Sequence, residues 1–123
     1  MKEKKKILVV EDEPDILKTI KMSLEMEDFE VIEATDGMEA LNQARQQHPD
    51  LIILDLMLPK MDGYKVCSML KFDKKYMHIP IVVLTAKAQE KDEKLAKKSG
   101  ADVYLTKPVT PDKVIQQINK LLK

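Results

Sequence analysis

The sequence predicts an α/β fold in which a five-stranded parallel sheet carries helices on both faces. Strand-like apolar runs alternate with helix-like patterns five times along the 123 residues, and such alternation is typical of parallel sheets joined by crossover helices. The apolar runs are continuous, as expected for strands that are covered on both faces. The length fits one domain, residues 1–123, built around a single core.

The first half of the chain contains two strand–helix units. Residues 7–10 form an apolar strand, and Pro14 suits the first turn of the helix that follows. A second strand at 30–34 turns at 35–37 into a helix that ends before Pro49. One face of the first helix carries Ile16, Leu17, Ile20 and Leu24, and the second helix is expected to bury Ala40, Leu41 and Ala44.

The central strand delivers an acid to the edge of the sheet. Residues 51–54 are apolar without alternation, and Asp55 follows at the carboxyl end of the run. Pro59 and the Asp62–Gly63 pair break the chain soon afterwards. A buried strand that ends in this way presents its last side chain, so Asp55 is expected to be the working residue.

The second half continues the alternation with a helix at about 64–72, a strand at 79–84 and a strand at 102–106. The helix between those strands, at about 89–99, offers little apolar surface, so it should be the least firmly held. Gly100 is a suitable stop for it. The helix at 64–72 is expected to bury Val66, Cys67, Met69 and Leu70, and the last helix, opened by Pro111 and Asp112, carries Val114, Ile115, Ile118, Leu121 and Leu122 on one stripe.

Composition limits the class of protein. Lys and Arg number 21 and so do Asp and Glu, so the net charge is zero and no global field attracts nucleic acid or membrane. Cys67 is the single cysteine, which excludes an internal disulfide and favours a reducing compartment. No apolar run reaches the length of a signal peptide or a membrane span. We therefore expect a soluble, cytoplasmic protein.

Chemically active side chains follow four of the predicted strands. In parallel α/β sheets, ligands bind beyond the carboxyl ends of the strands. Taken alone, each of these residues has a plainer explanation, such as a helix-start acid, a loop acid, a turn threonine or a surface lysine. Their joint occurrence at the strand ends is the stronger signal. The set is Glu11, Asp12, Asp55, Thr85 and Lys107.

This set predicts a divalent metal site. Two carboxylates at ~4 Å repel by about 4 kcal/mol at an effective dielectric near 20, and with Lys107 the three acids leave a net charge of −2. One divalent cation neutralises that charge. Oxygen ligands favour Mg²⁺, with Mn²⁺ as a substitute, whereas zinc is disfavoured because no His or Cys stands at these strand ends.

With a metal bound, Asp55 is a candidate nucleophile for phosphoryl transfer. The resulting acyl phosphate replaces one negative charge by about two. The Lys107 ammonium can pair with one phosphoryl oxygen, and the Thr85 hydroxyl can donate to another.

The motifs resemble the receiver domain of two-component response regulators, the family of the chemotaxis regulator. The resemblance implies a flavodoxin-like, doubly wound fold of three layers, with five helices and the strand order 2-1-3-4-5. It covers essentially the whole chain, and it is strongest at residues 8–14, 49–63, 80–86 and 100–108.

The resemblance also implies a function, namely phosphorelay signal transduction. Asp55 accepts a phosphoryl group from a histidine of a sensor histidine kinase or phosphotransfer protein. The metal is Mg²⁺, which is held by Glu11, Asp12, Asp55 and the backbone carbonyl of Met57. Apart from its own phosphorylation and dephosphorylation, such a domain catalyses no reaction.

The same resemblance implies a switch. Thr85 moves toward the phosphoryl group, Tyr104 swings inward behind it, and Lys107 bridges to the acid. The face formed by the fourth helix, the fifth strand and the last helix then changes shape. That face meets an output protein, a fused output domain or a second copy in a phosphorylation-dependent dimer, without direct binding of nucleic acid by this domain.

Two positions tune the lifetime of the phosphoryl group in this family. Met57 and Lys87 lie two residues beyond Asp55 and Thr85. An apolar Met57 is poorly equipped to orient an attacking water, whereas Lys87 can approach the phosphoryl group, so we predict a longer-lived phosphoryl group than with a polar residue at position 57. Glu11 stands where Asp is also frequent, and its extra methylene favours a water-mediated metal contact.

Other functions fit less well. Flavin-binding modules of this architecture need a Gly-, Ser- or Thr-rich phosphate cradle after the first strand, where this chain has acids and Pro14. An aspartyl-phosphate phosphatase needs a second acid where Met57 stands. The P-loop pattern of nucleotidases is missing. A receiver fragment of a longer DNA-binding regulator remains an alternative.

Overall fold

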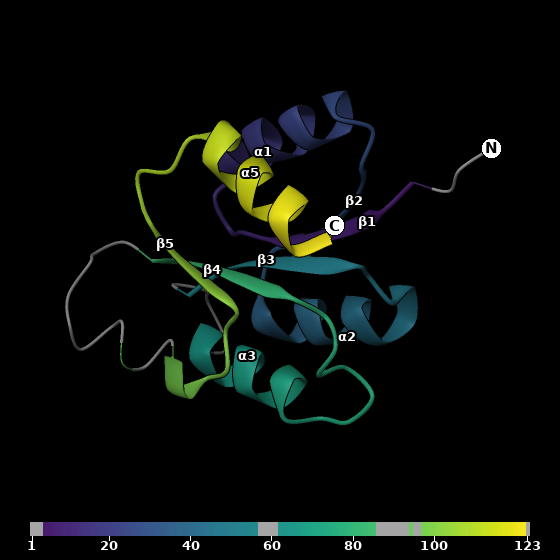
Figure 1. Ribbon diagram of the computed structural model, residues 1–123, viewed down its shortest axis with the longest axis vertical. Helices are drawn as coiled ribbons and strands as arrows, with labels where there is room; N and C mark the ends of the chain where they lie inside the picture. Colours follow the sequence, from purple (N-terminus) through teal and green to yellow (C-terminus); the bar gives the residue numbers. More distant parts are fainter. Residues whose placement is uncertain (1–3, 57–61, 86–93, 95–96, 123) are drawn as a thin grey trace.

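Five parallel strands form one sheet in the order β2-β1-β3-β4-β5 in the computed structural model (Figure 1). The structure describes residues 4–56, 62–85, 94 and 97–122. The predicted α/β fold and strand order are confirmed. The strands are β1 (Lys6–Val10), β2 (Glu30–Ala34), β3 (Leu51–Asp55), β4 (Ile81–Thr85) and β5 (Val103–Thr106), and the helices are α1 (Pro14–Met26), α2 (Gly37–Gln47), α3 (Gly63–Lys71) and α5 (Pro111–Leu122).

The helices cover both faces of the sheet. In Figure 1, α1 and α5 lie above the sheet, and α2 and α3 lie below it. Consecutive strand residues point to opposite faces. Leu8 therefore belongs to the core cluster between the sheet and helices α2 and α3, and Val9 to the cluster between the sheet and helices α1 and α5. All residues of β3 and β4 are buried. The continuous apolar runs are thereby explained, because neither face of these strands meets water.

The turns predicted from sequence begin helices where expected. Pro14 is the first residue of α1, and the Asp36 side chain caps α2 by accepting a hydrogen bond from the Glu39 amide at 2.8 Å. Gly63 follows the capping Asp62 at the start of α3. A Cβ on Gly63 would lie 2.6 Å from Leu56 Cα. Only glycine therefore lets this helix approach the segment after Asp55 so closely.

The predicted fourth helix falls largely outside the described residues. Of the range 89–99, residues 94, 97 and 98 are described as helical. Gly100 has a φ of 87°, and its amide donates to the Lys97 carbonyl at 3.1 Å. The predicted stop at Gly100 is confirmed.

Two details of the sequence prediction were wrong. Met69 was expected to be buried but is 40 % exposed, because the buried stripe of α3 runs along its neighbours at helical spacing and Met69 lies beside it. The fourth strand begins at Ile81 and not at Ile79. Pro80 lacks an N–H, and the Ile79 amide donates to the Tyr76 carbonyl in a turn at 3.0 Å.

Candidate functional site

The carboxyl ends of four strands bring the predicted residues together. Glu11 follows β1, Asp55 ends β3, Thr85 ends β4, and Lys107 follows β5. Lys107 Nζ donates to Asp55 Oδ2 at 2.7 Å and to Glu11 Oε1 at 3.0 Å. One ammonium group thus bridges two acids from separate strands. The contact between Lys107 and Glu11 was not foreseen from sequence.

Three acids form a cluster at this edge. One carboxylate oxygen from each of Glu11, Asp12 and Asp55 lies within 4.8 Å of the others. Glu11 is 1 % exposed and Asp55 is 2 % exposed, whereas Asp12 lies at the surface. The cluster therefore has two buried acids and one that faces solvent. A set of oxygen donors this compact fits a hard divalent cation such as Mg²⁺.

Burial and the neighbouring Asp55 raise the pKa of Glu11. Its pKa is raised from 4.5 to about 7, most of all by burial and then by the hydrogen bond to Asp55 and the charge of Asp55, against the opposing effects of Lys107 and the Glu13 amide. That amide donates to Glu11 Oε2 at 3.2 Å. The three acids and the single ammonium that contacts two of them leave a formal charge of −2, so Lys107 alone does not neutralise the site. The residues present thus fit an additional cation.

Lys107 itself stays cationic. Burial, the largest single effect, lowers its pKa, but the hydrogen bonds and charges of Asp55 and Glu11 together outweigh burial and raise the pKa above its ordinary value. The backbone fixes the position of this side chain, because the Lys107 amide donates to the Thr85 carbonyl at 2.6 Å. The ammonium is consequently a fixed positive charge beside Asp55.

Thr85 and Tyr104 meet on the next two strands. The Thr85 side chain is buried, and its Oγ1 lies 3.3 Å from the Tyr104 hydroxyl, at hydrogen-bond distance. Tyr104 is half-buried on β5 and packs against the core cluster beneath α2 and α3. The ring therefore packs on the face of the sheet that α2 and α3 cover. Position 104 is the one that the family resemblance identifies as a switch.

A cavity not foreseen from sequence opens beside the acids. It has a volume of about 580 Å³ and lies between α1 and the segment that leads into α5. Its wall is mostly apolar, with Ile16, Leu84 and Val109, and it includes Lys107 and the exposed Thr19. The site thus has an acidic centre and an apolar flank. Met57 and Lys87, by contrast, lie outside the described residues.

Comparison with known proteins identifies the family. The sequence model described as "Response regulator receiver domain" matches residues 7–119. The chain belongs to this family. Receiver domains act in phosphorelay signalling, and that is the function of this chain. The resemblance inferred from the sequence motifs is confirmed.

Relatives of the receiver domain include proteins of two lengths. The chain is 46 % identical over 119 residues to the alkaline phosphatase synthesis transcriptional regulatory protein PhoP of Bacillus subtilis, covering 97 % of this chain and 49 % of PhoP. It is 36 % identical over 118 residues to the polar-differentiation response regulator DivK of Brucella ovis, covering 96 % of both. The chain spans about half the length of PhoP and of several other curated relatives.

Solved receiver structures have the same fold. The chemotaxis response regulator CheY4 of Vibrio cholerae is 29 % identical and matches with a TM-score of 0.90, covering 98 % of this chain and 100 % of CheY4. A CheY-like receiver domain from Methanospirillum hungatei, also 29 % identical, matches with a TM-score of 0.90, covering 98 % of this chain and 94 % of that one. Among the described residues of our chain, no helix has the length and apolar character needed to cross a membrane.

Proposed function

We propose that this receiver domain, residues 1–123, accepts a phosphoryl group on Asp55 in an Mg²⁺-dependent reaction. The observation that supports this proposal best is the placement of Asp55. Its carboxylate is buried at the end of β3, 2.7 Å from the Lys107 ammonium and within the acid cluster. A nucleophile, a fixed cation and a set of metal ligands are thereby present in one place.

The residues of the chain have separate tasks in this reaction. Glu11, Asp12, Asp55 and the backbone carbonyl of Met57 would hold Mg²⁺, or Mn²⁺ in its place. When bound, the cation supplies positive charge that offsets the acids and the incoming phosphoryl oxygens. An Asp55 oxygen forms a bond to phosphorus while the phosphorus–nitrogen bond of a donor phosphohistidine breaks, and the imidazole leaves. Lys107 then pairs with the phosphoryl group.

Phosphorylation can be tested by intact mass spectrometry. Incubation of the protein with Mg²⁺ and acetyl phosphate should add the mass of one phosphoryl group. The Asp55→Asn variant, or wild type with excess chelator, should gain none. Asp112→Asn is a matched control, because Asp112 lies on exposed helix surface away from the acids. Full phosphorylation of Asp55→Asn would contradict the assignment of Asp55.

The physiological phosphodonor is a histidine kinase or a histidine phosphotransfer protein. The apolar cavity beside Lys107 supports a protein donor, since a small phosphodonor has no need of such a surface. Thr19 lines the cavity and is exposed. Thr19→Glu should slow transfer from a phosphorylated histidine protein by about tenfold without affecting transfer from acetyl phosphate. Equal slowing with both donors would point to a defect in the acceptor site instead.

The output is another protein or a fused domain. The half-length match to PhoP, a transcriptional regulator by its name, supports the alternative in which this receiver is a fragment of a longer regulator. The match to DivK over nearly its full length supports a stand-alone receiver. In either case, Thr85 and Tyr104 move on phosphorylation, and the face of β5, α5 and the helix before Gly100 meets the partner or a second copy. Light scattering with and without beryllium fluoride tests for the phosphorylation-dependent dimer.

The phosphoryl group resides on the protein for longer than in receivers with a polar residue at position 57. An apolar Met57 offers no hydrogen bond to orient an attacking water, while Lys87 can approach the phosphoryl oxygens. Met57→Asn should therefore lose phosphate faster than wild type, as followed by intact mass after removal of the donor.

The domain works in the cytoplasm and turns over no separate substrate. Steady hydrolysis of a generic phosphate ester would favour the phosphatase alternative.

A further inference from the structure

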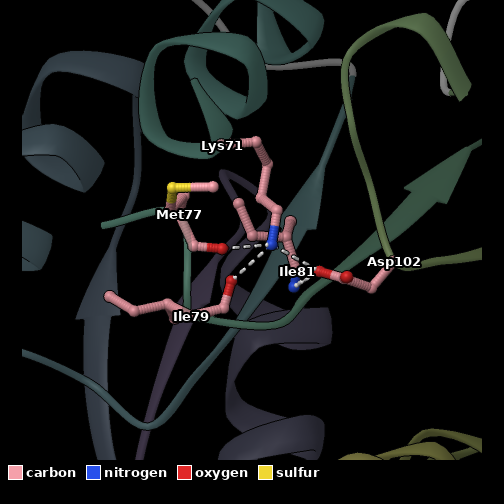
Figure 2. A network of polar contacts seen from close by, with 5 residues as sticks. All are labelled: Lys71, Met77, Ile79, Ile81 and Asp102. Carbon is pink, nitrogen blue, oxygen red and sulfur yellow. Dashed lines mark hydrogen bonds and ion pairs between the residues drawn. The ribbon is translucent and has the colours of Figure 1, made fainter. Parts of the chain in front are cut away.

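A polar network ties the start of β5 to the end of α3, far from the acids (Figure 2). Lys71 Nζ donates to the carbonyl oxygens of Met77 and Ile79 at 2.9 and 3.0 Å, and to Asp102 Oδ2 at 2.9 Å. These three acceptors satisfy the three donors of an ammonium group. The same Asp102 oxygen accepts the Ile81 amide at 2.8 Å. The Lys71 side chain is only 12 % exposed.

Asp102 forms hydrogen bonds with both backbone polar groups of Ile81. Its own amide donates to the Ile81 carbonyl at 3.0 Å, while its carboxylate accepts the Ile81 amide. Asp102 immediately precedes β5, and Ile81 is the first residue of β4. Lys71 neutralises the carboxylate that makes this contact. The pair therefore fixes where β5 begins along β4.

Packing specifies the register of β5 less strongly than that of the central strands. β5 is a four-residue strand at the sheet edge, and none of its residues is buried. Register is strongly specified where one face of a strand is buried and only weakly otherwise. By contrast, every residue of β3 and β4 is buried. Contacts at the ends of β5 therefore contribute more to its register than they would in β3 or β4.

The site depends on that register. Tyr104 packs on the side of α2 and α3, whereas Val103 and Leu105 pack on the side of α1 and α5. A slip of one residue would exchange these faces and move Lys107 by about 3.3 Å along the strand. The 2.7 Å contact between Lys107 and Asp55 cannot survive such a shift.

We propose that the Lys71–Asp102 pair, at the opposite end of the sheet, holds β5 in register and so positions Lys107 and Tyr104 at the phosphorylation site. Lys71 and Asp102 are positioning residues and contact none of the acids. The part of this inference that concerns phosphorylation rests on the proposed role of Asp55. The register itself can be measured without any phosphodonor, so the two ideas can fail separately.

The test compares Lys71→Met with wild type. Methionine keeps the unbranched chain except for its last atom, and it removes the ammonium. Lys21→Met is the matched control, because it makes the same change in an exposed ion pair, with Glu33 at 3.7 Å. Hydrogen exchange of the β5 amides should become about tenfold faster in Lys71→Met than in wild type or Lys21→Met. Exchange of β1 and β3 amides should stay unchanged.

The rate of phosphorylation should also depend on the Lys71 ammonium. At saturating Mg²⁺ and acetyl phosphate, the phosphorylation rate of Lys71→Met should fall by about tenfold, since displacement of a catalytic group by about 1 Å can cost a hundredfold. Mg²⁺ affinity should not fall, because the acids that would bind the ion lie at the carboxyl ends of β1 and β3, away from the substitution. Lys71→Arg should restore part of the rate. A wild type that gains no phosphate would overturn the role of Asp55 but would leave the exchange result standing.

Other outcomes would overturn the positioning role. Unchanged β5 exchange in Lys71→Met would show that the pair does not hold the strand. An equal rise in β1, β3 and β5 exchange would show a general loss of stability instead. Asp102→Asn covers the case in which Lys71→Met fails to fold, because it keeps an oxygen for the Ile81 amide while removing the charge. In Asp102→Asn, too, exchange should become faster in β5 and stay unchanged in β1 and β3. A variant that lacks this selective pattern would count equally against the proposal.

Discussion

Glu11 makes the stability of the metal-free protein depend on pH. Its side chain is 1 % exposed, and its pKa is raised from 4.5 to about 7, first by burial and then by the Asp55 carboxylate. In the unfolded chain the carboxyl group is solvated and its pKa returns to the ordinary value. Folding therefore forces a carboxyl group that is ionised at neutral pH into a place that favours its protonated form.

The direction in which the free energy of unfolding changes with pH follows from proton binding. Between pH 4.5 and about 7 the folded chain holds a proton on Glu11 that the unfolded chain has released. Folded protein binds more protons in this window, so the free energy of unfolding falls as the pH rises through it. This loss is absent below the unfolded pKa and complete above the folded pKa. At about 1.4 kcal/mol per pH unit, the interval corresponds to about 3 kcal/mol.

Urea unfolding of the metal-free protein, with chelator present, measures the effect at several pH values from about 5 to 8. The matched variant Glu11→Gln keeps the size of the side chain and removes its titration. Compared with wild type, it should gain about 3 kcal/mol of stability on going from the acidic to the alkaline end. Glu33→Gln, at an exposed position, controls for the substitution itself.

Mg²⁺ provides an independent check. A cation held by Glu11, Asp12 and Asp55 favours the ionised carboxylates, so saturating Mg²⁺ should flatten the pH dependence of the wild type. Parallel pH profiles for wild type and Glu11→Gln without metal would refute the reasoning, because the slope would then come from groups other than Glu11.

Three further changes test other parts of the structure. Lys107→Met should lower the free energy of unfolding of the metal-free protein by about 2 kcal/mol near neutral pH, yet tighten Mg²⁺ binding in a calorimetric titration, because Asp55 loses its competing ammonium. Gly63→Ala should cost about 2 kcal/mol or more in urea unfolding, since the added Cβ would lie 2.6 Å from Leu56 Cα; a neutral result would mean that this backbone shifts easily. Cys67 is 0 % exposed, and burial also raises the pKa of its thiol, so a thiol reagent should react only as fast as the protein opens or unfolds.

Local patterns were sufficient to predict the strands and most helix starts. The runs at 7–10 and 51–54 are apolar throughout, and the run at 30–34 carries Val31 and Ile32 before the turn at 35–37, so local side chains largely decide these strands. The error at Ile79 has a local cause as well. Pro80 cannot donate to the sheet ladder, and the strand begins only after it.

The site was predictable in its members and less so in its electrostatics. Parallel topology alone brings the carboxyl ends of β1, β3, β4 and β5 to one edge, so the convergence of Asp55, Thr85 and Lys107 followed from the order of the elements. An acidic run gives no sign of which acid is buried. Glu11 is enclosed while Asp12 and Glu13 are exposed, and that difference depends on how neighbouring strands pack around the first acid.

The register of β5 against β4 could not be predicted from local sequence patterns. The four residues of β5 are all half-buried and would accept more than one register against β4. The chain fixes the strand through contacts at its two ends, between Lys71 and Asp102 at one and from Lys107 to Asp55 and Glu11 at the other. These contacts join residues 31, 52 and 96 positions apart in the sequence. No window of ordinary helix or strand length contains both partners of any of them, so the position of Lys107 could be expected from the topology, but its distance to Asp55 required the folded structure.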